Sequence, residues 1–113
     1  MSDCIFCKII QGDIPSTNVY KDELVTAFRD INPVAPTHIL IVPNKHIESV
    51  NVLIADDEPL IGKLFTIAKG LAEKEGIAEN GYRLVVNTGA ESGQTIFHVH
   101  LHLIGGRQMK AMG

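Results

Sequence analysis

The sequence predicts an α+β fold in which a mainly antiparallel sheet packs on one long helix. Strand-like segments follow one another in runs with short connections, and only one long stretch has helical periodicity. A doubly wound α/β fold would need helices between most strands. Neither Gly-x-Gly-x-x-Gly nor Gly-x-x-x-x-Gly-Lys occurs in the chain, which disfavours dinucleotide-binding and P-loop proteins.

The N-terminal segments predict a short helix followed by a hairpin. Residues Cys4–Gln11 are apolar and short enough for one or two helical turns, and Gly12–Pro15 break them. The β-rich segments Thr17–Tyr20 and Leu24–Arg29 flank the polar Lys21–Glu23. Two such segments around a short polar turn are typical of a β-hairpin.

A loop and a third strand come next. The segment Asp30–Thr37 holds two prolines in eight residues, which exclude regular structure and favour an extended loop. The apolar run His38–Val42 then predicts a strand, and Pro43 is expected to end it.

One long amphipathic helix follows, beginning at the acidic segment Asp56–Pro59 and ending before Gly76. Its apolar residues recur at helical spacing: Leu60, Ile61, Leu64, Phe65, Ala68, Leu71 and Ala72. Two last strands are predicted at Tyr82–Asn87 and Val99–Ile104, separated by the glycine-containing loop Thr88–Gln94.

Length, charge and cysteine content limit the classes of function. A chain of 113 residues suits a single domain over residues 1–113, made firmer by dimerisation. The net charge of −3, without a basic block, argues against a partner that is duplex nucleic acid. No apolar run approaches the length of a membrane span and no secretory leader is evident, so we expect no membrane partner and a cytoplasmic location.

Three of the five histidines, His98, His100 and His102, alternate with apolar residues near the C-terminus. In a strand this period directs the three imidazoles to one face and Val99 and Leu101 to the other, so only the aliphatic face is expected to be core. Adjacent imidazoles repel one another when protonated, so some of them must be neutral. Strict alternation within strand-like sequence disfavours an exposed cluster resembling a purification tag.

A neutral imidazole can act as a nucleophile when one ring nitrogen is free and the other is fixed by an acceptor. The middle residue, His100, suits this role because it has a histidine on each side. Attack on phosphorus would give a phosphoramidate that water discharges. Phosphoryl or nucleotidyl transfer also needs donors around the non-bridging oxygens, and the loop from Asn87 to Thr95 offers amides, hydroxyls and backbone N–H groups.

Two metal-based alternatives remain open. The three histidines could be ligands of a catalytic metal, which would need a further ligand and an open position. Separately, Cys4 and Cys7 are spaced Cys-x-x-Cys, which in a reducing compartment suggests metal or redox chemistry rather than a disulfide. The redox interpretation is weaker because no thioredoxin-like βαβ pattern surrounds the pair.

The chain resembles the histidine triad (HIT) superfamily, and within it the Hint, or histidine triad nucleotide-binding, branch. The resemblance covers nearly the whole chain. It is carried by Asp30-Ile-Asn-Pro-Val-Ala-Pro-Thr-His38, Asn87 with Gly93-Gln-Thr95, His98-Val-His-Leu-His-Leu and Gly105-Gly-Arg-Gln-Met109. It implies a five-stranded antiparallel sheet with helices, a homodimer, and hydrolysis of adenosine 5′-phosphoramidate, related purine nucleoside phosphoramidates or acyl-adenylates to AMP without a catalytic metal or other catalytic cofactor.

The same resemblance implies roles for individual residues. His100 would be the nucleophile, His38 and His102 would relay protons and contact phosphate, and His98 would orient the active strand. Asp30 would accept hydrogen bonds from the ribose hydroxyls. The remaining implied contacts are Phe6 and Ile31 with the purine, and Asn87, Gly93, Gln94 and Thr95 with the α-phosphate.

Bacterial members of the family often hold a structural zinc, which here implies the ligands Cys4, Cys7, His46 and His98. Two thiolates and two imidazoles suit tetrahedral zinc. Thr95 stands where serine is common, and the chain lacks the tryptophan segment that follows Arg-Gln-Met in eukaryotic Hint proteins. A dinucleoside polyphosphate hydrolase of the same superfamily and a nucleotide-binding interaction module are the alternative functions.

Overall fold

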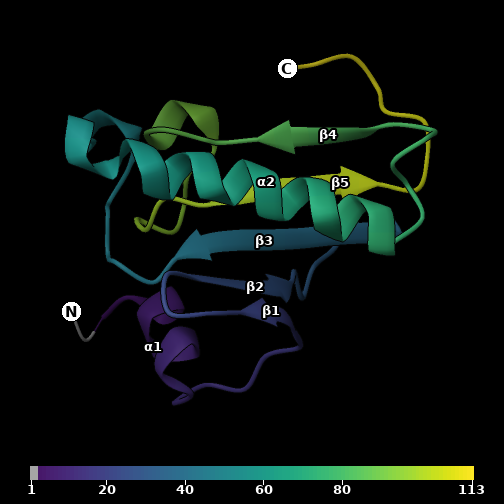
Figure 1. The fold of residues 1–113 in the computed structure, drawn as a ribbon. Helices are drawn as coiled ribbons and strands as arrows, with labels where there is room; N and C mark the ends of the chain where they lie inside the picture. Colours follow the sequence, from purple (N-terminus) through teal and green to yellow (C-terminus); the bar gives the residue numbers. More distant parts are fainter. Residues whose placement is uncertain (1–2) are drawn as a thin grey trace.

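The computed structural model describes residues 3–113 and confirms the α+β class. Five antiparallel strands form one sheet in the order β1-β2-β3-β5-β4 (Figure 1). The strands are β1 (Asn18–Lys21), β2 (Val25–Arg29), β3 (Thr37–Pro43), β4 (Tyr82–Val85) and β5 (Leu101–Gly105). The helices are α1 (Ile5–Gln11) and α2 (Glu58–Lys74). Three short 3₁₀ turns at Val50–Val52, Ala55–Asp57 and Ala90–Ser92 lie in the connections.

The strand boundaries differ from the predicted ones by one or two residues, and three of these differences have a structural meaning. Pro43 is the last residue of β3 rather than its terminator, since a proline without an N–H is tolerated at a strand end. Strand β4 ends at Val85, two residues early. Strand β5 begins only at Leu101, so His98 and His100 precede it.

Helix α2 lies across one face of the sheet (Figure 1), and α1 packs on part of the other face. The larger core lies between α2 and one face, where Ile39 and Ile41 of β3 meet Leu64 and Ala68. Alternate residues of β3, Leu40 and Val42, point the other way. On that face they form a smaller cluster with Phe28 of β2 and with Phe6 and Ile9 of α1. Strand β3 is therefore buried throughout.

Ion pairs fix α2 against the sheet at both ends. The Arg29 guanidinium holds the Glu75 carboxylate with two hydrogen bonds of 3.0 and 2.8 Å, which joins β2 to the end of α2. Nearer the start of α2, Lys63 contacts the Asp22 carboxylate at 2.9 Å. Asp22 also accepts from two backbone N–H groups, so it closes the β1–β2 turn and anchors it to the helix.

No helix in the part of the chain that the structure describes is long and apolar enough to span a membrane.

We predict that Gly105→Ala lowers the free energy of unfolding by about 1–3 kcal/mol. An added Cβ would lie 2.6 Å from Ile77 Cδ1 and 3.2 Å from Tyr82 Cβ, at the point where β5 packs against the segment after α2. Gly70→Ala is the matched control, because space around Gly70 is open and alanine favours a helix by up to about 1 kcal/mol. Urea unfolding of both variants measures the difference, and equal stabilities would contradict the packing argument.

Candidate active site and metal centre

The imidazoles of His38, His98, His100 and His102 lie on the α1 face of the sheet. His98 is fully buried, and His38 and His100 are nearly so. Ring centroids are 4.9 Å apart for His100 and His102 and 5.2 Å apart for His38 and His102. The expectation that only the aliphatic face forms core is thus wrong, because α1 and its Phe6 cover the imidazole face as well.

Burial lowers the pKa of all four imidazoles below the ordinary value of 6.5. The pKa falls to about 4 for His98 and for His102, where charge repulsion from neighbouring imidazoles adds to the effect of burial. All four rings are therefore neutral near pH 7, and each has one N–H and one lone pair.

The hydrogen bonds of His100 determine where its proton lies. Its Nδ1 is 2.7 Å from the His98 carbonyl oxygen, which can only accept. Nδ1 therefore carries the proton and Nε2 carries the lone pair. This is the arrangement that a nucleophilic imidazole needs.

A second set of hydrogen bonds connects His38 and His102. The Val34 backbone N–H donates to His38 Nδ1 at 3.2 Å, so the His38 proton lies on Nε2. That nitrogen is 3.0 Å from His102 Nδ1, which then accepts and leaves the His102 proton on its own Nε2. This Nε2–H is buried and has no hydrogen-bond partner among residues 3–113. A buried donor without a partner is destabilising unless a ligand supplies an acceptor.

Asp30 lies at the edge of this set. Its Oδ2 is 3.4 Å from His38 Nε2, and its Oδ1 accepts from the Asn32 backbone N–H at 2.8 Å. Ile31 beside it is 89% exposed, whereas Phe6 is buried with its ring 5.0 Å from that of His100 and edge-on to it. Of the two residues expected near a purine, Ile31 is therefore accessible to a ligand, whereas Phe6 is buried against the His100 ring.

The loop from Asn87 to Thr95 precedes the three alternating histidines. Many of its hydrogen-bond donors are used within the protein. Gln94 is buried, and its Nε2 donates to the carbonyls of Glu48 and Ile96. Its Oε1 accepts from the Gly89 N–H, and its own N–H and that of Gly93 close the Ala90–Ser92 turn. In the described chain, the Asn87 amide and the Thr95 hydroxyl make no hydrogen bond. These two side chains therefore have free hydrogen-bonding groups.

Cys4, Cys7, His46 and His98 form a compact group in which the ligand atoms all lie within 4.8 Å of one another. His98 Nε2 donates to the Pro43 carbonyl at 2.7 Å, so its Nδ1 lone pair faces the thiols. The distances from His98 Nδ1 are 3.4 Å to Cys4 Sγ, 3.6 Å to Cys7 Sγ and 3.2 Å to His46 Nδ1. Tetrahedral zinc places ligand nitrogens and sulfurs about 3.6 Å apart and two nitrogens about 3.3 Å apart. The group therefore fits zinc.

This group does not include His100 or His102. The described residues contain one other cluster of metal-ligand type, formed by Asp30, His38 and His102. The three alternating histidines thus do not converge on a single metal position. The catalytic-metal alternative, in which His98, His100 and His102 share one ion, is wrong for this geometry.

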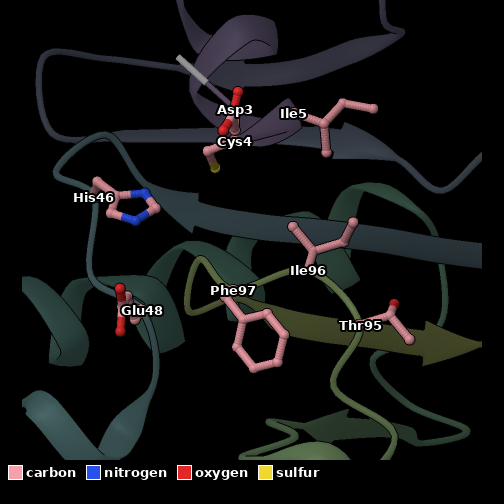
Figure 2. A pocket seen from close by; sticks show the side chains of 8 residues that line it. All are labelled: Asp3, Cys4, Ile5, His46, Glu48, Thr95, Ile96 and Phe97. Carbon is pink, nitrogen blue, oxygen red and sulfur yellow. The ribbon is translucent and has the colours of Figure 1, made fainter. Parts of the chain in front are cut away.

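A pocket of about 350 Å³ opens beside the thiol and imidazole group. Figure 2 shows Cys4 and His46 at one side of it and the side chains of Ile96 and Phe97 along another. Sequence reasoning did not identify this pocket. It also missed the backbone groups of Val34 and Pro43, because a backbone donor or acceptor leaves no mark in the residue type.

Comparisons with known proteins agree with this geometry. A family model described as "HIT domain" matches residues 11–109. The chain is 54% identical over 110 residues to the purine nucleoside phosphoramidase of Escherichia coli K12, covering 97% of this chain and 92% of that protein. Among solved structures, a HIT family hydrolase from Legionella pneumophila is 53% identical with a TM-score of 0.94, over 96% of each chain. Another from Clostridium thermocellum is 46% identical with a TM-score of 0.96, over 99% of this chain and 97% of that one. With most of its length matched by the family model and by these relatives, the chain belongs to the HIT domain family.

Proposed function

We propose that this protein is a purine nucleoside phosphoramidase that hydrolyses adenosine 5′-phosphoramidate and related phosphoramidates or acyl-adenylates to AMP. The observation that carries the proposal is the proton arrangement of the neighbouring imidazoles. His100 has its lone pair on Nε2, and His102 has a buried N–H without a partner in the described chain. The identity of 54% with a protein named purine nucleoside phosphoramidase supports this substrate class.

In the proposed reaction, His100 Nε2 attacks the α-phosphorus and a phosphorus–nitrogen bond forms on the enzyme. The bond from phosphorus to the leaving group breaks; a leaving amine takes up a proton from solvent water, whereas an acyl leaving group departs as its carboxylate. The His102 Nε2–H would donate to a non-bridging phosphoryl oxygen as negative charge develops there. Water then attacks the same phosphorus, and the phosphorus–nitrogen bond to His100 breaks. AMP leaves, the attacking water loses a proton to solvent, and His100 is again neutral. No step requires a metal or another cofactor.

The nucleotide contacts form part of the same proposal. Asp30 would accept from the ribose hydroxyls, and Ile31 with Phe6 would border the purine. The Asn87 amide and the Thr95 hydroxyl would contact the α-phosphate. Gln94 and Gly93 would border the α-phosphate by shaping the loop, since their backbone N–H groups and the Gln94 side-chain donors are already hydrogen-bonded within the protein.

A substrate panel tests the proposal. We expect the purified protein to release AMP from adenosine phosphoramidates and acyl-adenylates faster than from diadenosine polyphosphates. We expect His100→Ala to reduce turnover by about a thousandfold or more, because it removes the covalent step, while AMP affinity changes little. Intact mass spectrometry after rapid quenching should detect one AMP on the wild type and none on the variant.

A preference for diadenosine polyphosphates would identify the dinucleoside polyphosphate hydrolase alternative instead. A protein that binds AMP but turns over no member of the panel would be an interaction module. Retention of more than about a tenth of the wild-type rate by His100→Ala would contradict the nucleophile assignment.

We expect Asp30→Ala to weaken the binding of ribonucleotides far more than the binding of their 2′,3′-dideoxy analogues. Only the ribonucleotides lose a charge-assisted hydrogen bond of about 1.5–3 kcal/mol. Dissociation constants of AMP and dideoxy-AMP for both proteins measure the difference. Asp30→Asn is the matched variant that keeps an acceptor. Equal losses for both ligands would show that Asp30 only shapes its loop through Asn32.

We also propose that Cys4, Cys7, His46 and His98 hold a structural zinc ion. Bound there, zinc would supply folding free energy by joining α1 to the loop after β3 and to the start of the triad. We expect Cys4→Ser and Cys7→Ser each to lose about one equivalent of zinc per chain, by the four-ligand rule for structural sites. His100→Ala is the control that should keep it.

Elemental analysis of protein purified without chelator measures this zinc content. Chelation should lower the thermal midpoint more than it lowers activity at moderate temperature. Wild-type protein without zinc, or zinc lost only with His100, would contradict the structural site.

Finally, we propose that residues 1–113 act as one domain, pair as a homodimer and work in the cytoplasm. Strand β4 lies at a sheet edge and leaves backbone groups free to pair with a second copy. Phe65 on α2 is 44% exposed and offers apolar surface for the same association. The two free cysteines suit a reducing compartment.

A further inference from the structure

The segment that follows β5 has no role in the proposed reaction, yet it contacts the loop between β2 and β3. Arg107 donates from Nε and Nη2 to the Val34 carbonyl at 3.1 and 3.0 Å. Its Nη1 donates to the Gln108 carbonyl at 2.9 Å. No carboxylate pairs with Arg107 among residues 3–113. The guanidinium therefore donates to backbone carbonyls, and mainly to that of Val34.

Gly106 lies close to the same loop between β2 and β3. Its φ of 97° is in the left-handed region, and an added Cβ would lie 2.9 Å from Pro36 Cβ. Only glycine allows the chain to turn here so near to Pro36. Two adjacent residues thus fix the loop independently, Gly106 by close packing and Arg107 by hydrogen bonds.

Val34 connects this contact to the imidazoles. Its carbonyl accepts from Arg107, while its N–H donates to His38 Nδ1. A backbone N–H can only donate, so His38 Nδ1 must hold a lone pair and Nε2 the proton. The His38 Nε2–H then donates to His102 Nδ1, which leaves the His102 proton on Nε2.

The opposite tautomers would reverse the function of His102. With the His38 proton on Nδ1, its Nε2 would accept from His102 Nδ1–H. His102 Nε2 would then present a lone pair to a phosphoryl oxygen and repel it. Asp30 Oδ2 also favours the proton on His38 Nε2, but its distance of 3.4 Å is longer than that of the Val34 hydrogen bond.

We propose that Arg107 is a positioning residue: by holding Val34, it keeps the protons of His38 and His102 on their Nε2 atoms and directs the His102 Nε2–H at the substrate phosphate. The proposal rests on the proposed function for its substrate, but the tautomers can be measured without any substrate.

The test combines NMR of ¹⁵N-histidine-labelled protein with kinetics on adenosine 5′-phosphoramidate. Arg107→Met removes every donor and keeps an unbranched stem, and Arg107→Lys restores one charged donor. Arg83→Met is the matched control, since Arg83 also donates to a backbone carbonyl, that of Lys110, at 2.9 Å, and in the described chain it makes no hydrogen bond to Val34 or to an imidazole. Long-range ¹H–¹⁵N spectra report which ring nitrogen of His38 and His102 carries the proton.

We expect wild-type and Arg83→Met proteins to show the Nε2–H tautomer at both histidines, and Arg107→Met to show a mixture. The kcat should fall about tenfold in Arg107→Met, as loss of one hydrogen bond in the transition state predicts, and should recover in part in Arg107→Lys. The thermal midpoint and the backbone spectrum verify that the variants are folded.

Wild-type tautomers in Arg107→Met would overturn the proposal even if its activity fell. Altered tautomers with unchanged kcat would overturn it as well, since the proton positions would then not matter to the reaction. A wild-type protein without phosphoramidase activity would instead contradict the proposed function, and the NMR comparison would still decide whether Arg107 controls the tautomers.

Discussion

The rest of the site depends on the hydrogen bonds and contacts of His98, whose imidazole is fully buried. Its Nε2 donates to Pro43 at the end of β3, and its Nδ1 faces two thiols and His46. Its backbone carbonyl accepts from His100. One residue therefore ties the central strand, the N-terminal helix and the candidate nucleophile together. A charged imidazole in this position would lose its hydration and gain no counterion. Burial therefore lowers the pKa of His98 and keeps the ring neutral.

The same contacts explain how so short a helix as α1 can form part of the site. Seven residues are too few for a stable helix in water, so α1 depends on tertiary contacts. Phe6 and Ile9 supply apolar burial against the sheet, and Cys4 at its N-cap with Cys7 in its first turn supplies the ligand atoms next to His98. The packing of α1 therefore both covers the imidazoles and completes the group of two thiols and two imidazoles.

The sequence predicted most of this fold and several of the residues that the structure brings together in the candidate site. Periodicity in residues 38–42 and 99–104 located β3 and β5, and the alternation of His98, His100 and His102 correctly placed their imidazoles on one face. The covering of that face by α1 was not predicted, because helix packing depends on contacts far apart in the chain. Gln94 illustrates a second limit: its amide looks like a phosphate donor in the sequence, but in the folded chain its N–H groups already donate to two backbone carbonyls.

Strand β5 is held at both ends by contacts of different kinds, and the imidazoles of His100 and His102 lie between them. Upstream, His98 anchors the chain to Pro43 and to the thiols; downstream, Gly106 and Arg107 press against the loop that carries Val34. The first anchor sets the proton of His100 through a carbonyl, and the second sets that of His102 through His38. Backbone groups at fixed positions thereby give two neighbouring histidines opposite tautomers. The proposed reaction would use the lone pair of one at phosphorus and the proton of the other at oxygen.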